Sequence, residues 1–152
     1  MAKRFPMQAL RDLANDRLEA ATRRLAHLKQ RWQAEEEKLA QLRGFREEYR
    51  KRLGESIASG LDMTRMRDFH AFLAKIETAI GQQTVEIQRC KTEWEAEQRL
   101  WLEERRKLKT YDVLKDRHLR AERAREGRVE QREQDEHARK SAAVSHGCDS
   151  DQ

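Results

Sequence analysis

The residues best suited to metal binding and proton transfer are scattered along this chain. Its cysteines are Cys90 and Cys148, and its histidines are His27, His70, His118, His137 and His146. A metal site needs several such ligands at short, characteristic spacings, and only His146 and Cys148 come close to one. Two ligands alone are a weak signal, so we expect no metal and no other cofactor.

Recognisable catalytic motifs are also missing. The sequence has no glycine-rich phosphate loop, no GxSxG, no HExxH and no CxxC. Carboxylates are abundant, but the surface of a rod offers no cleft that would shift their pKa values towards catalysis. We therefore expect no catalytic residues, and the chain is not predicted to be an enzyme.

The composition points to long helices. Of the 152 residues, 40% are charged and 37% hydrophobic, with one proline and six glycines. A compact globule has roughly 25% charged and 45–50% apolar residues. Such a chain is either disordered or elongated enough for a narrow apolar seam to suffice.

The charges suggest a solvated surface rather than a polyanion-binding one. There are 33 Lys and Arg against 28 Asp and Glu, a net charge of +5, and the two signs alternate along most of the chain. Interleaving of this kind is typical of a solvated helix face, so we do not expect nucleic-acid binding. No stretch approaches the roughly 18 apolar residues of a membrane span, and no signal peptide is recognisable. We expect a cytoplasmic protein without direct membrane insertion.

Apolar residues recur at spacings of three and four in the first half of the chain, as in a coiled-coil heptad. The seam positions are Leu18, Ala21, Leu25, Leu28, Trp32, Glu35, Leu39, Leu42, Arg46, Tyr49 and Leu53. Only Glu35 and Arg46 are not apolar or aromatic. The pattern predicts a helix from about residue 7 to residue 53.

A second seam follows after a break. Its positions are Met66, Phe69, Leu73, Ile76, Ile80, Gln83, Ile87, Cys90, Trp94, Glu97, Trp101, Glu104, Leu108 and Tyr111. This seam predicts a second helix from about residue 63 to residue 136. The second helix is longer than the first, so we expect it to overhang.

Residues 54–62 separate the two seams and read as a turn. Gly54 is placed to end the first helix, and Asp62 or Thr64 can cap the second. A loop this short forces the helices to run antiparallel. The prediction is an all-α fold: one long antiparallel two-helix coiled-coil hairpin, residues 1–140, with a disordered tail at 141–152. A parallel homodimer would leave the turn unexplained, so we favour a monomeric hairpin.

Centring the pairing on this turn predicts a register. The paired levels are then Tyr49 with Met66, Leu42 with Leu73, Leu28 with Ile87, Ala14 with Trp101, Trp32 with Gln83 and Glu35 with Ile80. The polar seam residues would face apolar ones rather than each other.

Three apolar residues lie beside the seam rather than on it. Phe45, Phe72 and Ala79 all occupy heptad position g, and the two g edges of an antiparallel pair flank the same side. They predict a small apolar ridge near the turn. The ridge either widens the core there or forms a partner-binding patch.

The segment from Lys115 to Lys140 has nine basic and seven acidic residues and almost nothing apolar. As a free helix it would depend on i,i+4 pairs worth only a few tenths of a kcal/mol each. We expect it to become ordered against a partner.

Several short patterns together resemble the FliJ family of flagellar type III export proteins. They are Leu10-x-x-Leu-Ala14, Glu47-Glu-Tyr-Arg50, the turn with Gly60, Phe69-x-x-Phe72-x-x-x-Ile76-Glu-x-Ala-Ile80, Trp101 and Leu108-x-x-Tyr-x-x-Leu114. The similarity extends from about residue 7 to residue 136. Aromatic positions and turn placement carry it better than the heptads do.

The resemblance implies a soluble component of the flagellar export apparatus, folded like the central stalk of rotary ATPases. The implied partners are the export ATPase FliI, with FliH, the export-gate protein FlhA and empty export chaperones. The implied location is cytoplasmic, held peripherally at the inner membrane through the apparatus.

The resemblance also implies a gate contact made by an aromatic and following aliphatic residues of the second helix. These match Phe72, Ile76 and Ala79, while Gln83 stands where relatives often have His. With Phe45 from the ridge, the expected gate-binding residues are Phe45, Phe72, Ile76, Ala79 and Gln83. The hypothesised end that enters the ATPase ring contains Leu10, Leu13, Leu18, Trp101, Leu108 and Tyr111.

Two alternatives remain open from the sequence. The equivalent stalk of a virulence-type injectisome shares this architecture. A generic coiled-coil scaffold or basic nucleic-acid binder is the other, and nucleic-acid binding would predict salt-sensitive retention of a random duplex.

Overall fold

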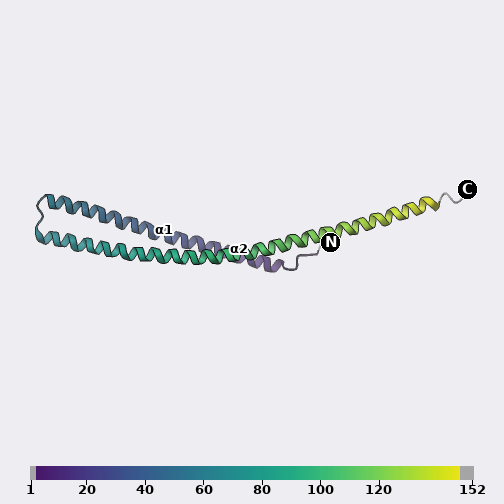
Figure 1. Ribbon diagram of the computed structural model, residues 1–152, viewed down its shortest axis with the longest axis horizontal. Coiled ribbons are helices and arrows are strands. Elements are labelled where there is room, and N and C mark those ends of the chain that lie inside the picture. Colours follow the sequence, from purple (N-terminus) through teal and green to yellow (C-terminus); the bar gives the residue numbers. More distant parts are fainter. Residues whose placement is uncertain (1–2, 148–152) are drawn as a thin grey trace. The chain divides into compact units, whose positions relative to one another are not determined.

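The computed structural model describes residues 3–147. They form two α-helices, α1 (Gln8–Ala58, 51 residues) and α2 (Met63–Gly147, 85 residues), and this described part contains no strand. Figure 1 shows α1 and α2 antiparallel and joined by a short turn. The predicted all-α helical hairpin is confirmed.

The chain divides into two compact units, and each helix contributes to both. The turn unit is Leu18–Glu104, and the terminal unit combines Met1–Arg17 with Arg105–Gln152. Within each unit, residues of α1 pack against residues of α2.

The predicted seam is the core of the turn unit. Its seam residues are all buried or half-buried, and Ala21, Leu39 and Cys90 are among the most buried side chains of the chain. Leu39 packs with Ile76 and Ile80, flanked by three further seam residues: Leu42, Tyr49 and Ile87. The hydrophobic effect selects this stripe because heptad spacing places all these side chains on one helix face.

The turn lies later in the chain than predicted. Helix α1 passes through Gly54 and ends at Ala58, and Gly60 has a φ of 87°. The Gly60 N–H donates to the Ile57 carbonyl oxygen at 3.2 Å, as in a glycine-terminated helix. The prediction that Gly54 ends the first helix was wrong. One glycine within a helix lowers its stability by only about 1 kcal/mol, which is too little to end a helix whose next residues favour continuation.

The start of α2 is capped as predicted, by Asp62 rather than Thr64. The Asp62 Oδ1 accepts a hydrogen bond from the Arg65 N–H at 2.8 Å. The Asp62 carbonyl oxygen also accepts the first helical bond, from the Met66 N–H at 3.1 Å. The side chain therefore satisfies one of the four N–H groups that every helix start leaves unpaired.

The predicted register was wrong by nearly one heptad. Tyr49 contacts Phe69 and Phe72, Trp32 contacts Trp94, and the Trp101 Nε1–H donates to Thr22 Oγ1 at 2.9 Å. Gln83 bonds to Glu35, so these two polar seam residues meet each other. Because the turn fixes the pairing of an antiparallel hairpin, moving its centre along the chain moves every partner.

The terminal unit holds residues 3–17 against α2. Phe5 is buried and its ring centroid lies 5.7 Å from that of His118, whose Nε2 lies 2.8 Å from the Lys3 carbonyl oxygen. The Arg11 Nε–H donates to Asp112 Oδ1 at 2.7 Å. This bond, together with the Asp112 charge, raises the pKa of Arg11.

Helix α2 extends beyond its predicted end near residue 136. Residues 141–147 are helical where a disordered tail was predicted, and residues 148–152, including Cys148, lie outside the described part. Gly127 is the only glycine between Gly81 and Gly147, and the sequence has no proline after Pro6, so no strong helix breaker ends the helix near residue 136. From Arg123 to Gly147 every residue is exposed.

Candidate functional site

Four aromatic side chains gather near the turn, and we call them the aromatic cluster: Phe45, Tyr49, Phe69 and Phe72. The Tyr49 ring centroid lies 5.1 Å from that of Phe69 and 4.6 Å from that of Phe72, both at tilted angles. Phe45 precedes Tyr49 by four residues on α1, which places the two side chains on one helix face. The cluster therefore spans both helices of the turn unit.

Two members of the aromatic cluster are exposed. Phe45 keeps 64% of its surface accessible and Phe72 keeps 47%, whereas Tyr49 and Phe69 are half-buried in the seam. Phe72 is thus held by Tyr49 without being covered. This geometry agrees with the second interpretation of the ridge, a surface patch, more than with a widened core.

The other three expected gate residues are less accessible. Ile76 is only 8% exposed and belongs to the core with Leu39 and Ile80, so its side chain is not available as a major contact. Ala79 is half-buried at the edge of the seam. Ile76 faces the opposite helix, as its predicted seam position requires, so its part in a gate contact stays a prediction.

Gln83 is engaged within the hairpin. Its Nε2 donates to the Glu35 carbonyl oxygen at 2.9 Å and to Glu35 Oε2 at 2.6 Å. Lys38 Nζ lies 3.0 Å from Glu35 Oε1. The hydrogen bond from Gln83 first, and that from Lys38 second, lower the pKa of Glu35. This polar layer satisfies both seam residues and leaves Gln83 little freedom for a partner.

Ion pairs link the helices on the surface near the aromatic cluster. Glu77 of α2 lies 3.0 Å from Arg50 and 3.5 Å from Arg46, both of α1, and Glu47 contacts the same two arginines at 3.2 and 3.3 Å. Exposed pairs contribute little each, but a network orders the long side chains. The exposed Phe45 therefore lies next in sequence to a network of ion-paired side chains that begins at Arg46.

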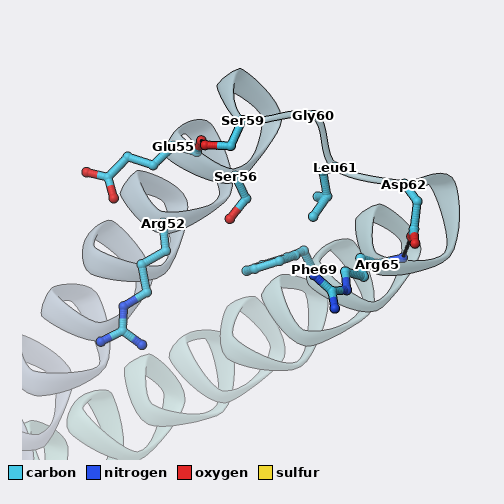
Figure 2. Close-up of a pocket in the computed structure, with 9 residues that line it drawn as sticks. All are labelled: Arg52, Glu55, Ser56, Ser59, Gly60, Leu61, Asp62, Arg65 and Phe69. Atoms are coloured by element: carbon cyan, nitrogen blue, oxygen red, sulfur yellow. Dashed lines mark hydrogen bonds between the residues drawn. The ribbon is translucent and has the colours of Figure 1, made fainter.

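An open hollow lies between the helix ends at the turn. Its lining residues, labelled in Figure 2, are Arg52, Glu55, Ser56, Ser59, Gly60, Leu61, Asp62, Arg65 and Phe69. Ser56, Leu61 and Phe69 point into it. Several polar lining groups are already used: Asp62 caps α2, Ser59 Oγ donates to the Glu55 carbonyl oxygen, and Arg52 pairs with Glu48. The Asp62 and Ser59 bonds thus help to close the turn, while Arg52 is held by a pair within α1.

The residues expected at the ATPase-ring end are divided between the units. Leu10 and Leu13 of the terminal unit are 49% and 46% exposed, and Leu108 and Tyr111 of the same unit are half-buried in its seam. Leu18 and Trp101 belong to the turn unit, where both are half-buried. Leu10 and Leu13 are thus the two that present substantial apolar surface.

The described residues offer no grouped metal ligands. Nowhere in residues 3–147 do three or more His, Cys, Asp or Glu side chains approach one another closely enough to hold a metal ion. In the same range, no helix has the length and apolar content that crossing a membrane requires. Cys90 is buried in the seam as an apolar residue.

Two long paired helices with aromatic rings exposed beside their seam place the chain in the class of two-helix coiled-coil proteins. The family model described as "Flagellar FliJ protein" matches residues 3–147. The chain therefore belongs to the FliJ family and is a component of the flagellar export apparatus.

Two relatives support this assignment. The flagellar FliJ proteins of Salmonella typhi and Escherichia coli K12 are each 28% identical to the chain over 142 residues, which cover 93% of this chain and 97% of theirs. No solved structure matches the chain significantly.

Part of the aromatic cluster is not apparent from the sequence. Tyr49 and Phe69 were assigned to the seam and to the family patterns, but the packing of Tyr49 against both Phe69 and Phe72 was not predicted. The late turn could have been recognised from Gly60, the glycine closest to the Asp62 cap. Nothing in the heptad pattern indicated the packing of Phe5 on His118.

Proposed function

We propose that this protein is the central stalk of the flagellar export ATPase ring, formed by FliI with FliH, and that it links the ring to the export-gate protein FlhA. It also escorts empty export chaperones. In this role it stays on the cytoplasmic side, held at the inner membrane only through the apparatus. Membership of the FliJ family and the antiparallel coiled coil support the proposal.

The observation that carries the gate contact is the exposure of Phe72 beside the seam. Its ring is 47% exposed but held against Tyr49, at 4.6 Å between centroids. An aromatic ring that is already positioned loses little conformational freedom on binding, and such rings often dominate the energy of an interface. Phe45 and Ala79 extend the same surface.

The exposed leucines of the terminal unit support the ring contact. Leu10 and Leu13 lie one turn apart on α1 and are each about half exposed. Leucines on a charged helix serve as anchors for a partner's apolar surface. They are the residues of the predicted ring end on which this contact depends most.

The stalk role is tested with purified export ATPase. Adding the protein should raise both the fraction of hexamer, measured by sedimentation, and ATP turnover. A Leu10→Ser/Leu13→Ser variant should stimulate less, while Phe72→Ala should stimulate as well as the natural chain. If neither assembly nor turnover responds to the natural chain, the stalk role is wrong.

The gate contact is tested by binding to purified FlhA. Phe72→Ala should weaken binding by about 1–2 kcal/mol, the usual cost of truncating an important aromatic contact. Val85→Ala is the matched control, since Val85 is also an exposed apolar residue of α2 in the turn unit, at 71%. Equal effects of the two substitutions would remove Phe72 from the gate contact.

A further inference from the structure

One face of α2 in the terminal unit carries arginines at eleven-residue intervals: Arg106, Arg117, Arg128 and Arg139. Eleven residues are close to three helical turns, so each arginine is rotated by only about 20° from the last. At 1.5 Å per residue the line is about 50 Å long. We call these four residues the arginine row.

The arginine row has no partners within the described chain. All four side chains are exposed, and none forms an ion pair or hydrogen bond within residues 3–147. Two cations of the same segment are paired, Arg125 with Glu122 and Lys140 with Glu136, both at 3.4 Å, whereas Arg120, Arg123 and Arg132 also lack a partner within residues 3–147. The row therefore presents uncompensated positive charge.

The surroundings of the arginine row reinforce this charge. A shallow groove between its first two members is lined by Arg106, Lys109, Thr110, Val113, Leu114 and Arg117, without a carboxylate. Arg132 lies one turn after Arg128 and is also exposed and without a partner in this part of the chain. Helical spacing puts a single carboxylate on this face, Asp135, which accepts a hydrogen bond from Gln131 at 3.1 Å.

The carboxylates of this segment gather on the opposite face. They are Glu122, Glu126, Glu130 and Glu133, spaced by three and four residues. Glu136 lies between the two faces, three residues before Arg139 and four after Arg132. Like charges at these spacings destabilise an isolated helix, and Arg128 and Arg132 repel each other in the same way. Placing the acidic and the basic residues on separate faces therefore destabilises the free helix. The stability of this segment alone does not explain the arrangement.

We propose that the arginine row docks onto a partner protein that presents carboxylates along a straight helix or ridge. Charge complementarity selects the occupant, because guanidinium groups bind carboxylates through paired hydrogen bonds. Because the four arginines lie in a nearly straight line along α2, their partner carboxylates should also lie in a line parallel to this helix. This docking surface stands on the row alone and does not depend on the stalk role.

Two other anionic surfaces fit the segment less well. The phosphates of a nucleic-acid duplex wind around the duplex axis, whereas the arginine row runs nearly straight along α2, so the row would follow them over only part of its length. A helix adsorbed on a bilayer needs large apolar residues beside its cations, and the groove supplies only Val113 and Leu114.

The test measures binding of the full chain to a labelled helical peptide with glutamates along one face, and to an isomer of identical composition with its glutamates scattered. Arg117→Glu/Arg128→Glu removes the centre of the row. Arg120→Glu/Arg123→Glu is the matched control, because both residues are exposed on the same helix, lack partners within residues 3–147 and change the charge equally. Circular dichroism verifies that both variants remain helical.

The row variant should bind the acid-faced peptide about tenfold more weakly, and the control within about twofold of the natural chain. The natural chain should prefer the acid-faced peptide to the scattered isomer. Equal losses in the two variants, or no preference between the peptides, would overturn the proposal. So would a row-dependent loss of binding to a DNA duplex or to phosphatidylserine vesicles without one for the peptide.

Discussion

At the scale of single residues, the position of an apolar side chain relative to the seam decides whether it is buried in the core or exposed. Ile76 and Phe72 are one turn apart on α2, yet one is buried between Leu39 and Ile80 and the other is 47% exposed. Heptad position alone separates them, because a d-type residue faces the partner helix and a g-type residue flanks it.

Substituting these two residues should show the division directly. Ile76→Ala should lower the free energy of unfolding by about 2–5 kcal/mol, because it opens a cavity in the core. Phe72→Ala should cost clearly less, since about half of its ring already contacts water. Urea denaturation of the two variants compares the costs, and a larger loss for Phe72→Ala would show that its ring is core.

Glu35 should make stability depend on pH. The hydrogen bond from Gln83, and then that from Lys38, hold the pKa of Glu35 below its ordinary value of 4.5. The ionised group therefore stabilises the fold above pH 4.5, and this contribution is lost as the pH falls through the lower, folded-state pKa.

Thermal melts of the natural chain and of Glu35→Gln between pH 6 and pH 3 should converge on acidification, once effects common to both are subtracted. In a Gln83→Ala background, the difference in melting temperature at pH 6 between the chains with Glu35 and with Glu35→Gln should be smaller. A constant difference over the whole range would show that the Glu35 carboxylate has the same pKa in both states.

At the scale of the elements, the end of α1 depends on one glycine and not on another. Gly60 has a φ of 87°, a conformation that side chains with a Cβ rarely adopt, while Gly54 lies in the regular helix with nothing near its would-be Cβ. The two glycines therefore predict opposite responses to alanine.

Gly60→Ala should destabilise the hairpin by about 1–2 kcal/mol because of the left-handed backbone. Gly54→Ala should stabilise it by about 0.5–1 kcal/mol by improving the helix. Chemical denaturation of both variants provides the measurement. If Gly60→Ala stabilised the hairpin and Gly54→Ala destabilised it, the first helix would end at Gly54 rather than at the turn with Gly60.

The seam and the cap could be predicted from the sequence, but the register could not. Every predicted seam residue from Leu18 to Glu104 is buried or half-buried, and Asp62 caps α2 as expected. Sliding one helix by a heptad returns apolar residues to apolar residues, so the pattern barely distinguishes neighbouring registers. The bond between Gln83 and Glu35 does distinguish them, since another register leaves both polar groups without this partner.

At the scale of the whole molecule, the pairing of α1 with α2 in one chain predicts a monomer. The melting temperature should then be independent of protein concentration, and sedimentation equilibrium should return the mass of one chain. A melting temperature that rises with concentration would favour the parallel homodimer, in which the seams of two chains pair.

The sequence alone determined the fold class, the seam and the scarcity of groups for catalysis or metal binding. These follow from local spacing, since a period near 3.5 residues decides which side chains share a helix face. It also contained the arginine row, which stood out only once the structure showed those side chains exposed and without partners.

Only the tertiary structure decided where the chain turns, which residues pair, and which expected contact residues reach the surface. Heptad position already separates Ile76 from Phe72, but only the structure shows that Phe72 packs against Tyr49 and still stays 47% exposed, while Gln83 is bonded to Glu35. The reason is physical: exposure depends on where the second helix lies, and its position follows from the turn at Gly60 and from the polar layer of Glu35 and Gln83.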